Sequence, residues 1–234
     1  MKPVFSRSIL AVAVALAAVP VTAGAASGYS LFGDAQLVSP GNGSPTGVQM
    51  RSSTTIAPNY GGIDFSVPSG TTFGSITNLS TDYMFTAGSC ADGSPRFQIN
   101  VDGVNAFVYI GPPPNYTACA MNVWTNTGNL AAPANFVDTS QLPGGTFYDT
   151  FAAANLKYGT HAVTGIQLVI DAGFAFSGGT QTVVVDNVMI NGTTFTFESK
   201  ESCKDGGWEN FTSSPGPFKN QGQCVSFFAG GDKN

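Results

Sequence analysis

The sequence is poor in the residues that most enzymes use for catalysis. Charged residues make up 10% of the chain, histidine occurs only as His161, and glutamate only as Glu198, Glu201 and Glu209. A Ser-His-Asp triad would have to use His161, but no Gly-x-Ser-x-Gly elbow surrounds any serine. Glycoside hydrolysis needs two close carboxylates, and all the glutamates lie near the C-terminus. We therefore expect that the chain is not an enzyme, and we predict no catalytic residue.

Basic residues are scarce as well. Nine lysines and arginines stand against 14 acidic residues, which gives a formal net charge of −5. Such a chain lacks the basic patch that phosphate backbones and anionic membrane surfaces require. We expect no nucleic-acid partner.

The N-terminus has the three parts of a cleavable secretory signal. Lys2 and Arg7 form a basic start, residues 9–21 form an apolar run, and Ala23-Gly24-Ala25 supplies small residues for cleavage. The apolar run is shorter than the roughly 20 residues of a bilayer-spanning helix. The sequence predicts a signal peptide over residues 1–25, an extracellular protein, and no membrane insertion after cleavage.

Four cysteines follow the predicted signal, namely Cys90, Cys119, Cys203 and Cys224. An even number in an exported chain favours disulfide bonds, and four cysteines allow three connectivities. A zinc site is the alternative, but it is poorly supplied by one histidine and no close cysteine pair. We predict the bonds between sequence neighbours, Cys90–Cys119 and Cys203–Cys224.

Strand-like segments fill most of the chain. In Arg96 to Asp102, the apolar residues Phe97, Ile99 and Val101 alternate with polar ones, as in a half-buried strand. The other predicted strands, separated by Gly, Pro, Ser and Asn clusters, are residues 28–38, 47–51, 62–67, 76–85, 107–110, 166–170, 183–190 and 193–197.

Three connections can be anticipated from this pattern. The glycine-containing loop 173–179 suggests that segments 166–170 and 183–190 pair as antiparallel neighbours, and Asn191-Gly192 is a typical hairpin turn. Residues 147–156 place apolar side chains at helical spacing, and Gly159 can end this helix.

The predicted fold class is all-β. We expect a two-sheet antiparallel jelly-roll-like sandwich over residues 26–197, with one short crossover helix. Charged residues become denser after Phe197, so residues 198–234 are expected to form a small C-terminal appendix closed by its own disulfide.

The C-terminal segment carries a resemblance to a known group of proteins. It reads Cys203-Lys-Asp-Gly-Gly-Trp208, and later Phe218-Lys-Asn-Gln-Gly-Gln-Cys224-Val225. This ending resembles that of many uncharacterised exported bacterial proteins, in which a β-sandwich often precedes it. Residues 93–99 and 185–188 also look like parts of that sandwich. The resemblance implies a location outside the cytoplasm and no particular activity.

A looser similarity is to jelly-roll carbohydrate-binding modules, many of which end in a strand like Val185-Asp186-Asn187-Val188. In those modules an acidic residue on that strand often helps to bind a structural calcium ion. Asp186, with Asp34 or Asp64, could supply the oxygen ligands that calcium prefers. We predict no required cofactor, and Asp186 and Asp34 are the candidate ligands of a structural calcium ion.

One loop combines aromatic and amide side chains. Trp124, Tyr116 and Tyr109 flank residues 112–119, and Asn115 and Asn122 lie beside them. A Cys90–Cys119 bond would hold these residues in a rigid patch on which a sugar ring could stack. The alternative is that Trp124 and Tyr109 are core residues of neighbouring strands.

The sequence leaves three functions open. The preferred one is a secreted, non-catalytic binding module for extracellular polysaccharide or cell-surface glycan. The second is a structural or adhesive envelope protein that binds a partner through its C-terminal tail. The third is a polysaccharide hydrolase or lyase. An exposed Trp124 would favour the first function, and an exposed aromatic patch on the tail would favour the second.

Overall fold

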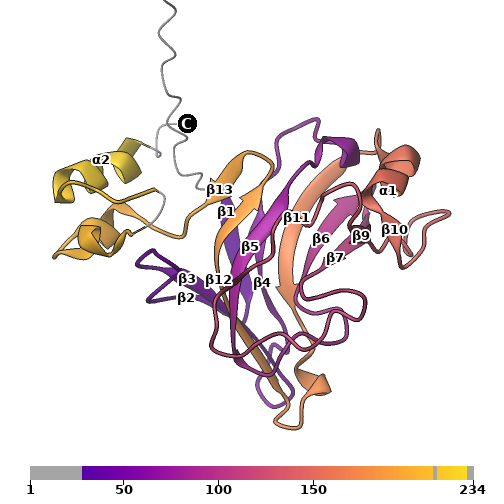
Figure 1. Cartoon of the computed structure of the whole chain (residues 1–234), viewed down its shortest axis with the longest axis horizontal. Coiled ribbons are helices and arrows are strands. Elements are labelled where there is room, and N and C mark those ends of the chain that lie inside the picture. Colours follow the sequence, from indigo (N-terminus) through magenta and orange to yellow (C-terminus); the bar gives the residue numbers. More distant parts are fainter. Residues whose placement is uncertain (1–27, 213–214, 231–234) are drawn as a thin grey trace, which may run out of the picture.

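The computed structural model of the protein describes residues 28–212 and 215–230. The predicted signal peptide lies outside these residues. The described chain forms two antiparallel β-sheets packed face to face, with a small helical unit at the C-terminal end (Figure 1). The predicted fold class is confirmed.

The first sheet, sheet A, has the strand order β1-β4-β11-β6-β7. These strands are β1 (Tyr29–Gly33), β4 (Gly61–Phe65), β11 (Val163–Ile170), β6 (Arg96–Val101) and β7 (Val104–Tyr109). Sheet B has the order β2-β3-β12-β5-β8, and β13 pairs with β12. Its strands are β2 (Ala35–Val38), β3 (Gly47–Ser53), β12 (Thr180–Ile190), β5 (Leu79–Ala87), β8 (Thr125–Asn126) and β13 (Thr193–Phe195). A two-stranded ladder of β9 (Phe136–Val137) and β10 (Asp149–Thr150) lies beside β7.

The core lies between the two sheets and follows the period-two pattern of the sequence. In β6, Phe97, Ile99 and Val101 are completely buried, while the residues between them are half-buried on the outer face. Strand β12 contributes Val183 and Val185 from the opposite sheet. Burial of these side chains is the main driving force for the sandwich.

Strands β11 and β12 do not pair with each other, so the predicted antiparallel pair is wrong. β11 pairs with β4 and β6 in sheet A, whereas β12 pairs with β3 and β5 in sheet B. The connection, which contains the short 3₁₀ helix η2 (Gly173–Ala175), crosses from one sheet to the other. At Gly173 an added Cβ would lie 2.5 Å from the Ser52 carbonyl oxygen, so this crossing point leaves no room for a side chain.

The predicted turn at Asn191-Gly192 is present. Ile190 of β12 pairs directly with Thr193 of β13, and Asn191 adopts a φ of +56°, a conformation that asparagine tolerates well.

The crossover helix begins later than predicted. Helix α1 (Phe151–Tyr158) is capped by Thr150, whose hydroxyl accepts a hydrogen bond from the Ala153 backbone N–H. Thr150 also belongs to β10, so the chain cannot be helical before it. As a result Phe147 is 63% exposed, whereas Phe151 is buried and stacks on Phe73 of the 3₁₀ helix η1 (Phe73–Ser75).

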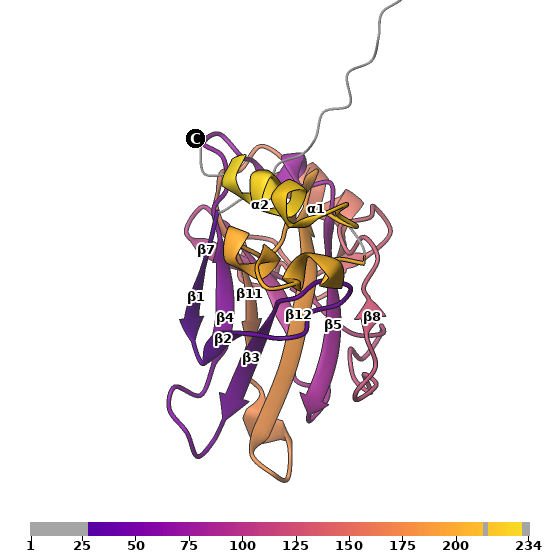
Figure 2. The ribbon, with the colours of Figure 1, turned by 90° about the vertical axis from the view of Figure 1, so that its left-hand side faces the viewer.

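The C-terminal unit has a small core of its own. It contains the 3₁₀ helices η3 (Lys200–Cys203) and η4 (Gly207–Asn210), followed by helix α2 (Gln221–Gly230). The Cys203–Cys224 disulfide and the rings of Phe211, Phe218 and Phe228 are buried together, and Trp208 packs against them. We call this unit the appendix. It lies on the sheet B side of the sandwich, opposite α1, β9 and β10 (Figures 1 and 2).

Hydrogen bonds fix the appendix to the sandwich at one loop. The Thr46 backbone N–H donates to Glu198, and the Thr212 N–H donates to the Gly43 carbonyl oxygen. Both contacts involve the loop between β2 and β3. Among the described helices, none is long and apolar enough to cross a membrane.

Candidate functional site

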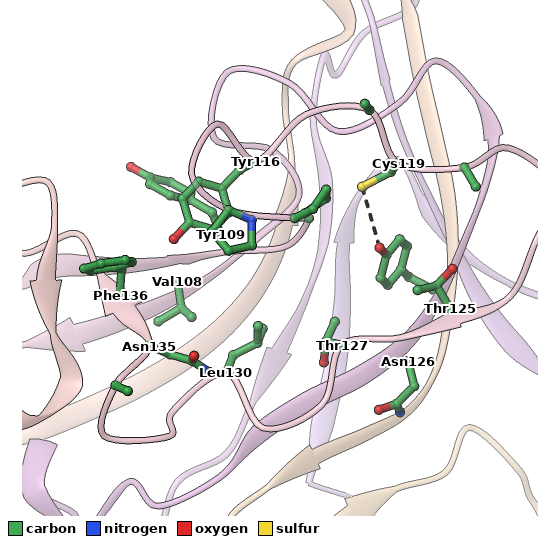
Figure 3. A pocket seen from close by; sticks show the side chains of 17 residues that line it. Val108, Tyr109, Tyr116, Cys119, Thr125, Asn126, Thr127, Leu130, Asn135 and Phe136 are labelled. Carbon is green, nitrogen blue, oxygen red and sulfur yellow. Dashed lines mark hydrogen bonds between the residues drawn. The ribbon is translucent and has the colours of Figure 1, made fainter.

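A groove of about 670 Å³ opens at one edge of the sandwich, between β7 of sheet A and β8 of sheet B (Figure 3). One wall comes from the loop that follows β7 and the other from the segment that leads from β8 to β9. Its lining includes Tyr109, Gly111, Tyr116, Asn126, Asn135 and Phe136. The whole lining set contains no charged side chain.

The loop after β7 is held in place by the Cys90–Cys119 disulfide, the first of the two predicted bonds. Gly111 lies directly against this bond with a φ of +126°. An added Cβ there would lie 2.8 Å from Cys90 Sγ, so only glycine fits. The Tyr116 backbone N–H then donates to the Pro112 carbonyl oxygen and closes the loop. The loop is thus fixed at both of its ends.

Two tyrosine rings form one side of the groove. Tyr116 has a φ of +52°, a conformation that is uncommon for a bulky residue and often occurs at functional sites. In this conformation its ring lies edge-on to Tyr109, with 5.4 Å between ring centroids. Figure 3 shows the two rings side by side, across the groove from Asn126 and Thr127.

The ring of Tyr109 is anchored by a buried carboxylate. The Tyr109 hydroxyl donates to Asp138 Oδ2, and Asp138 Oδ1 accepts from the Ser140 backbone N–H. Burial, and then the hydrogen bond and charge of Asp138, raise the pKa of Tyr109 far above its ordinary value. Tyr109 therefore stays a neutral hydrogen-bond donor, and its hydrogen bond to Asp138 holds the ring at the groove.

Phe136 also lines the groove and is 40% exposed. Its ring lies edge-on to Tyr148, with 5.9 Å between centroids, and Tyr148 is itself exposed. Residues 136 and 137 form β9, which is held against β7 because Phe107 and Asp138 exchange two backbone hydrogen bonds of 2.8 Å. This pairing brings Phe136 close to Tyr109 although the two are far apart in sequence.

Amide groups supply the polar part of the groove. Asn126 Nδ2 donates to Asp82 Oδ1 at 2.6 Å, and Asn126 Oδ1 accepts from the Gly128 N–H at 2.8 Å, so this amide has a fixed orientation. Asn135 Nδ2 donates to the Asn129 carbonyl oxygen. Apolar rings with a few oriented, uncharged polar groups are typical of a small-molecule or glycan site.

The structure brings together only part of the predicted site. Tyr109 and Tyr116 line the groove as a pair. Trp124 is half-buried and, like the exposed Asn115 and Asn122, does not line it. Asn122 instead adopts a positive φ and donates its backbone N–H to Phe85.

Phe136, Asn135, Tyr148 and Asp138 were missed because no local pattern marks them. β9 and β10 have two residues each, too few for a visible alternation. The one available sequence signal was an aromatic residue, Phe136, directly after Asn135 in a segment without a strand pattern.

The two predicted calcium ligands have separate partners. Asp34 Oδ2 lies 2.6 Å from Arg51 Nε, near the end of β3. Asp186 lies near the start of β3 instead, because the residue before it, Val185, pairs with Val48. Its carboxylate accepts hydrogen bonds from the Asn42 backbone N–H and the Ser44 hydroxyl. Within residues 28–212 and 215–230 no group of three or more His, Cys, Asp or Glu could hold a metal ion. The calcium site stays a prediction.

No family model and no curated protein match the chain. The chain is similar to an exo-beta-agarase, with a TM-score of 0.37 and 13% identity over 73% of this chain and 24% of that chain. It is also similar to the xyloglucanase domain of NopAA, a type three effector from Sinorhizobium fredii, solved with cellobiose. Here the TM-score is 0.34, with 14% identity over 72% of this chain and 94% of that chain.

The present chain thus spans about a quarter of the length of the agarase. Both similar proteins are enzymes by name, and this finding contradicts our expectation that the chain is not an enzyme. That expectation is withdrawn. The similarity assigns no activity to any residue of this chain.

Proposed function

We propose that the protein binds an extracellular carbohydrate in the groove between β7 and β8. The observation that carries this proposal is the pair of fixed rings, Tyr109 and Tyr116, facing oriented amides in a groove without charged side chains. Sugar rings offer C–H faces that pack on aromatic rings and hydroxyls that exchange hydrogen bonds with amides.

The charge of the groove favours a neutral ligand. The carboxylates nearest to it, Asp82 and Asp138, are buried and already accept hydrogen bonds from protein groups. An acidic ligand would find no cation in the lining, and a basic one would find no free carboxylate. We infer that the ligand is an uncharged polysaccharide or oligosaccharide.

The proposal includes export and two structural units. The two disulfides together use all four cysteines, as expected in an oxidising compartment. We propose that residues 1–25 are the signal peptide, that residues 26–197 form the binding sandwich, and that residues 198–234 form the appendix.

Replacement of Tyr116 by alanine is expected to weaken carbohydrate binding at least about tenfold, because it removes a contact surface that is already ordered in the free protein. The measurement is retention of the mature protein on cellulose, xylan, agarose and chitin, followed by an affinity titration on the best ligand. Phe136→Ala is expected to weaken binding in the same way.

Tyr60→Ala and Phe174→Ala serve as matched controls, because both rings are exposed and do not line the groove. They should bind like the unchanged protein. If the control variants lose as much affinity as Tyr116→Ala, or if no carbohydrate is retained at all, the groove is not the proposed site.

The alternative role, in which the tail binds a partner, would be favoured by an exposed aromatic patch on the appendix. Among the described residues, all large exposed apolar side chains lie outside the appendix. The appendix directs its phenylalanine rings towards one another instead, as in the pairs Phe211–Phe218 and Phe211–Phe228.

A further inference from the structure

The outer face of sheet A carries an ordered row of polar side chains. Asp64 of β4, Gln167 of β11 and Gln98 of β6 are direct neighbours in the strand register. Their strands bury Ile63, Leu168 and Phe97 on the other face, as expected from strand alternation. The polar row therefore lies on the side of sheet A that faces away from the core.

Hydrogen bonds run along this row from strand to strand. Gln167 Nε2 donates to Asp64 Oδ1 at 2.5 Å, and Gln98 Nε2 donates to Gln167 Oε1 at 2.9 Å. Arg96 in turn donates to Gln98 Oε1 at 2.9 Å and forms a bidentate ion pair with Asp171, at 2.7 and 2.8 Å. Each amide thus has a fixed orientation, and the arginine charge is matched within the protein.

The row borders a hollow of about 390 Å³. Its lining comes from four strands of sheet A, and consists of Asp64, Gln98, Asn100, Asn105, Thr164, Gly165 and Gln167. Gly165 lies on its floor, next to an irregularity in the β11–β6 pairing, and an added Cβ there would meet no atom within 4 Å. The absence of a side chain at Gly165 keeps the hollow open.

Two polar groups in the hollow remain available for a ligand. Within the described residues, neither Asp64 Oδ2 nor Asn105 Nδ2 has a hydrogen-bond partner, although the rest of the row is fully connected. One acceptor and one donor beside oriented amides suit hydroxyl groups, which can both donate and accept. Asp64 is the only ionisable group in the lining, so the hollow excludes anions.

The hollow and the groove are connected through one strand. Asn105, Phe107 and Tyr109 alternate with the buried Ala106 and Val108, so all three lie on the same face of β7. Asn105 lines the hollow and Tyr109 lines the groove. Phe107 lies between them, with the Arg96 guanidinium 5.2 Å from its ring centroid. A single extended ligand can therefore touch both sites by following β7.

We propose that the outer face of sheet A is a second carbohydrate subsite, centred on Asp64, Gln167 and Gly165, that receives further sugar units of a neutral chain held in the groove. This inference rests on the proposed function and adds to it a ligand length and direction. The chain runs from Tyr116 along β7 towards Gly165. The protein is thus built for an extended polysaccharide rather than for a mono- or disaccharide.

The test compares short and long ligands on the mature protein. Affinities are measured by calorimetry for cellobiose against cellohexaose and for neoagarobiose against neoagarohexaose. Gly165→Val is expected to bind the disaccharide like the unchanged protein and to lose about tenfold in affinity for the hexasaccharide. Valine suits a strand, and a Cβ at this position would meet no protein atom within 4 Å, so the variant should fold normally.

Gly178→Val is the matched control, because an added Cβ at Gly178 also meets nothing within 4 Å and this glycine lines neither site. Asn105→Ala is a second probe of the hollow and should lower only the hexasaccharide affinity. If Gly165→Val and Asn105→Ala bind both lengths like the unchanged protein, the subsite is wrong while the groove stands. If the unchanged protein binds none of these sugars and is retained on none of the four polysaccharides named above, the proposed function fails together with this inference.

Discussion

Replacement of Cys203 and Cys224 by serine is expected to unfold the appendix and leave the sandwich folded. The bond closes a loop over a sequence separation of 21, and removing it costs roughly 3 kcal/mol in the chain-entropy model. The core that would have to compensate consists of the two sulfurs and three phenylalanine rings, which is too small to fold alone. The sandwich keeps its own core and the Cys90–Cys119 bond.

Amide hydrogen exchange measures this directly. In the serine variant, the amides of α2 and η3 should exchange at the rate of an unstructured chain, while those of β5, β12 and β6 keep their protection. Because the groove lies on the sandwich, carbohydrate binding should be unchanged. Loss of protection throughout β5 and β12 would contradict the division of the chain into two units.

The second large effect concerns the buried carboxylate of Asp186, which is 1% exposed. Burial raises its pKa to about 6, and the nearby Glu198 adds to the shift. Hydrogen bonds from Ser44 and from the backbone N–H groups of Asn187 and Asn42 act in the opposite direction but do not cancel the effect of burial.

Stability is therefore expected to fall as the pH rises from about 4 to about 6. In this range the folded protein keeps a proton on Asp186 that the unfolded chain, with a pKa of 3.8, has lost. The free energy of unfolding should decrease by about 3 kcal/mol, since one pKa unit corresponds to about 1.4 kcal/mol. Glu198, whose pKa is also raised by burial, contributes with the same sign. Urea unfolding at a series of pH values measures the slope.

Asp186→Asn should remove most of this slope, because asparagine is neutral at every pH and has nearly the same shape. Asp92→Asn, at an exposed position, is the control and should keep the slope. Asp149 does not interfere. Burial acts to raise the pKa of Asp149, but hydrogen bonds from Lys157 and Thr139 outweigh it and lower this pKa. The stability that Asp149 contributes is therefore lost only below about pH 4. Stability that rises from pH 4 to pH 6 would show that Asp186 is ionised in the folded protein.

Local patterns predicted the strands well but not their partners. The alternation of Phe97, Ile99 and Val101 indicates one buried face of a strand, and Asn191-Gly192 indicates a turn. No local signal tells which sheet receives a strand, so β11 and β12 were wrongly paired. The helix begins at Phe151 and not at Phe147, because the Thr150 hydroxyl caps its N-terminus. The spacing of the apolar residues does not reveal this cap.

The groove was predictable only where its residues are close in sequence. Tyr109 and Tyr116 are near the Cys90–Cys119 bond in the sequence, and both are among the predicted binding residues. Phe136 arrives through two long-range hydrogen bonds between Phe107 and Asp138, which no spacing rule reveals. The same holds for the polar row on sheet A, which exists only once β4, β11 and β6 are in register.

Binding of an extended carbohydrate along β7 is tested most directly by a chemical-shift map of the isotope-labelled mature protein, titrated with cellohexaose and neoagarohexaose. We expect concentration-dependent shifts at the amides of Tyr116, Phe136, Asn105 and Gly165, and no shifts at the amides of the appendix. Shifts confined to the appendix around Trp208, or no shifts with either sugar, would contradict this binding mode.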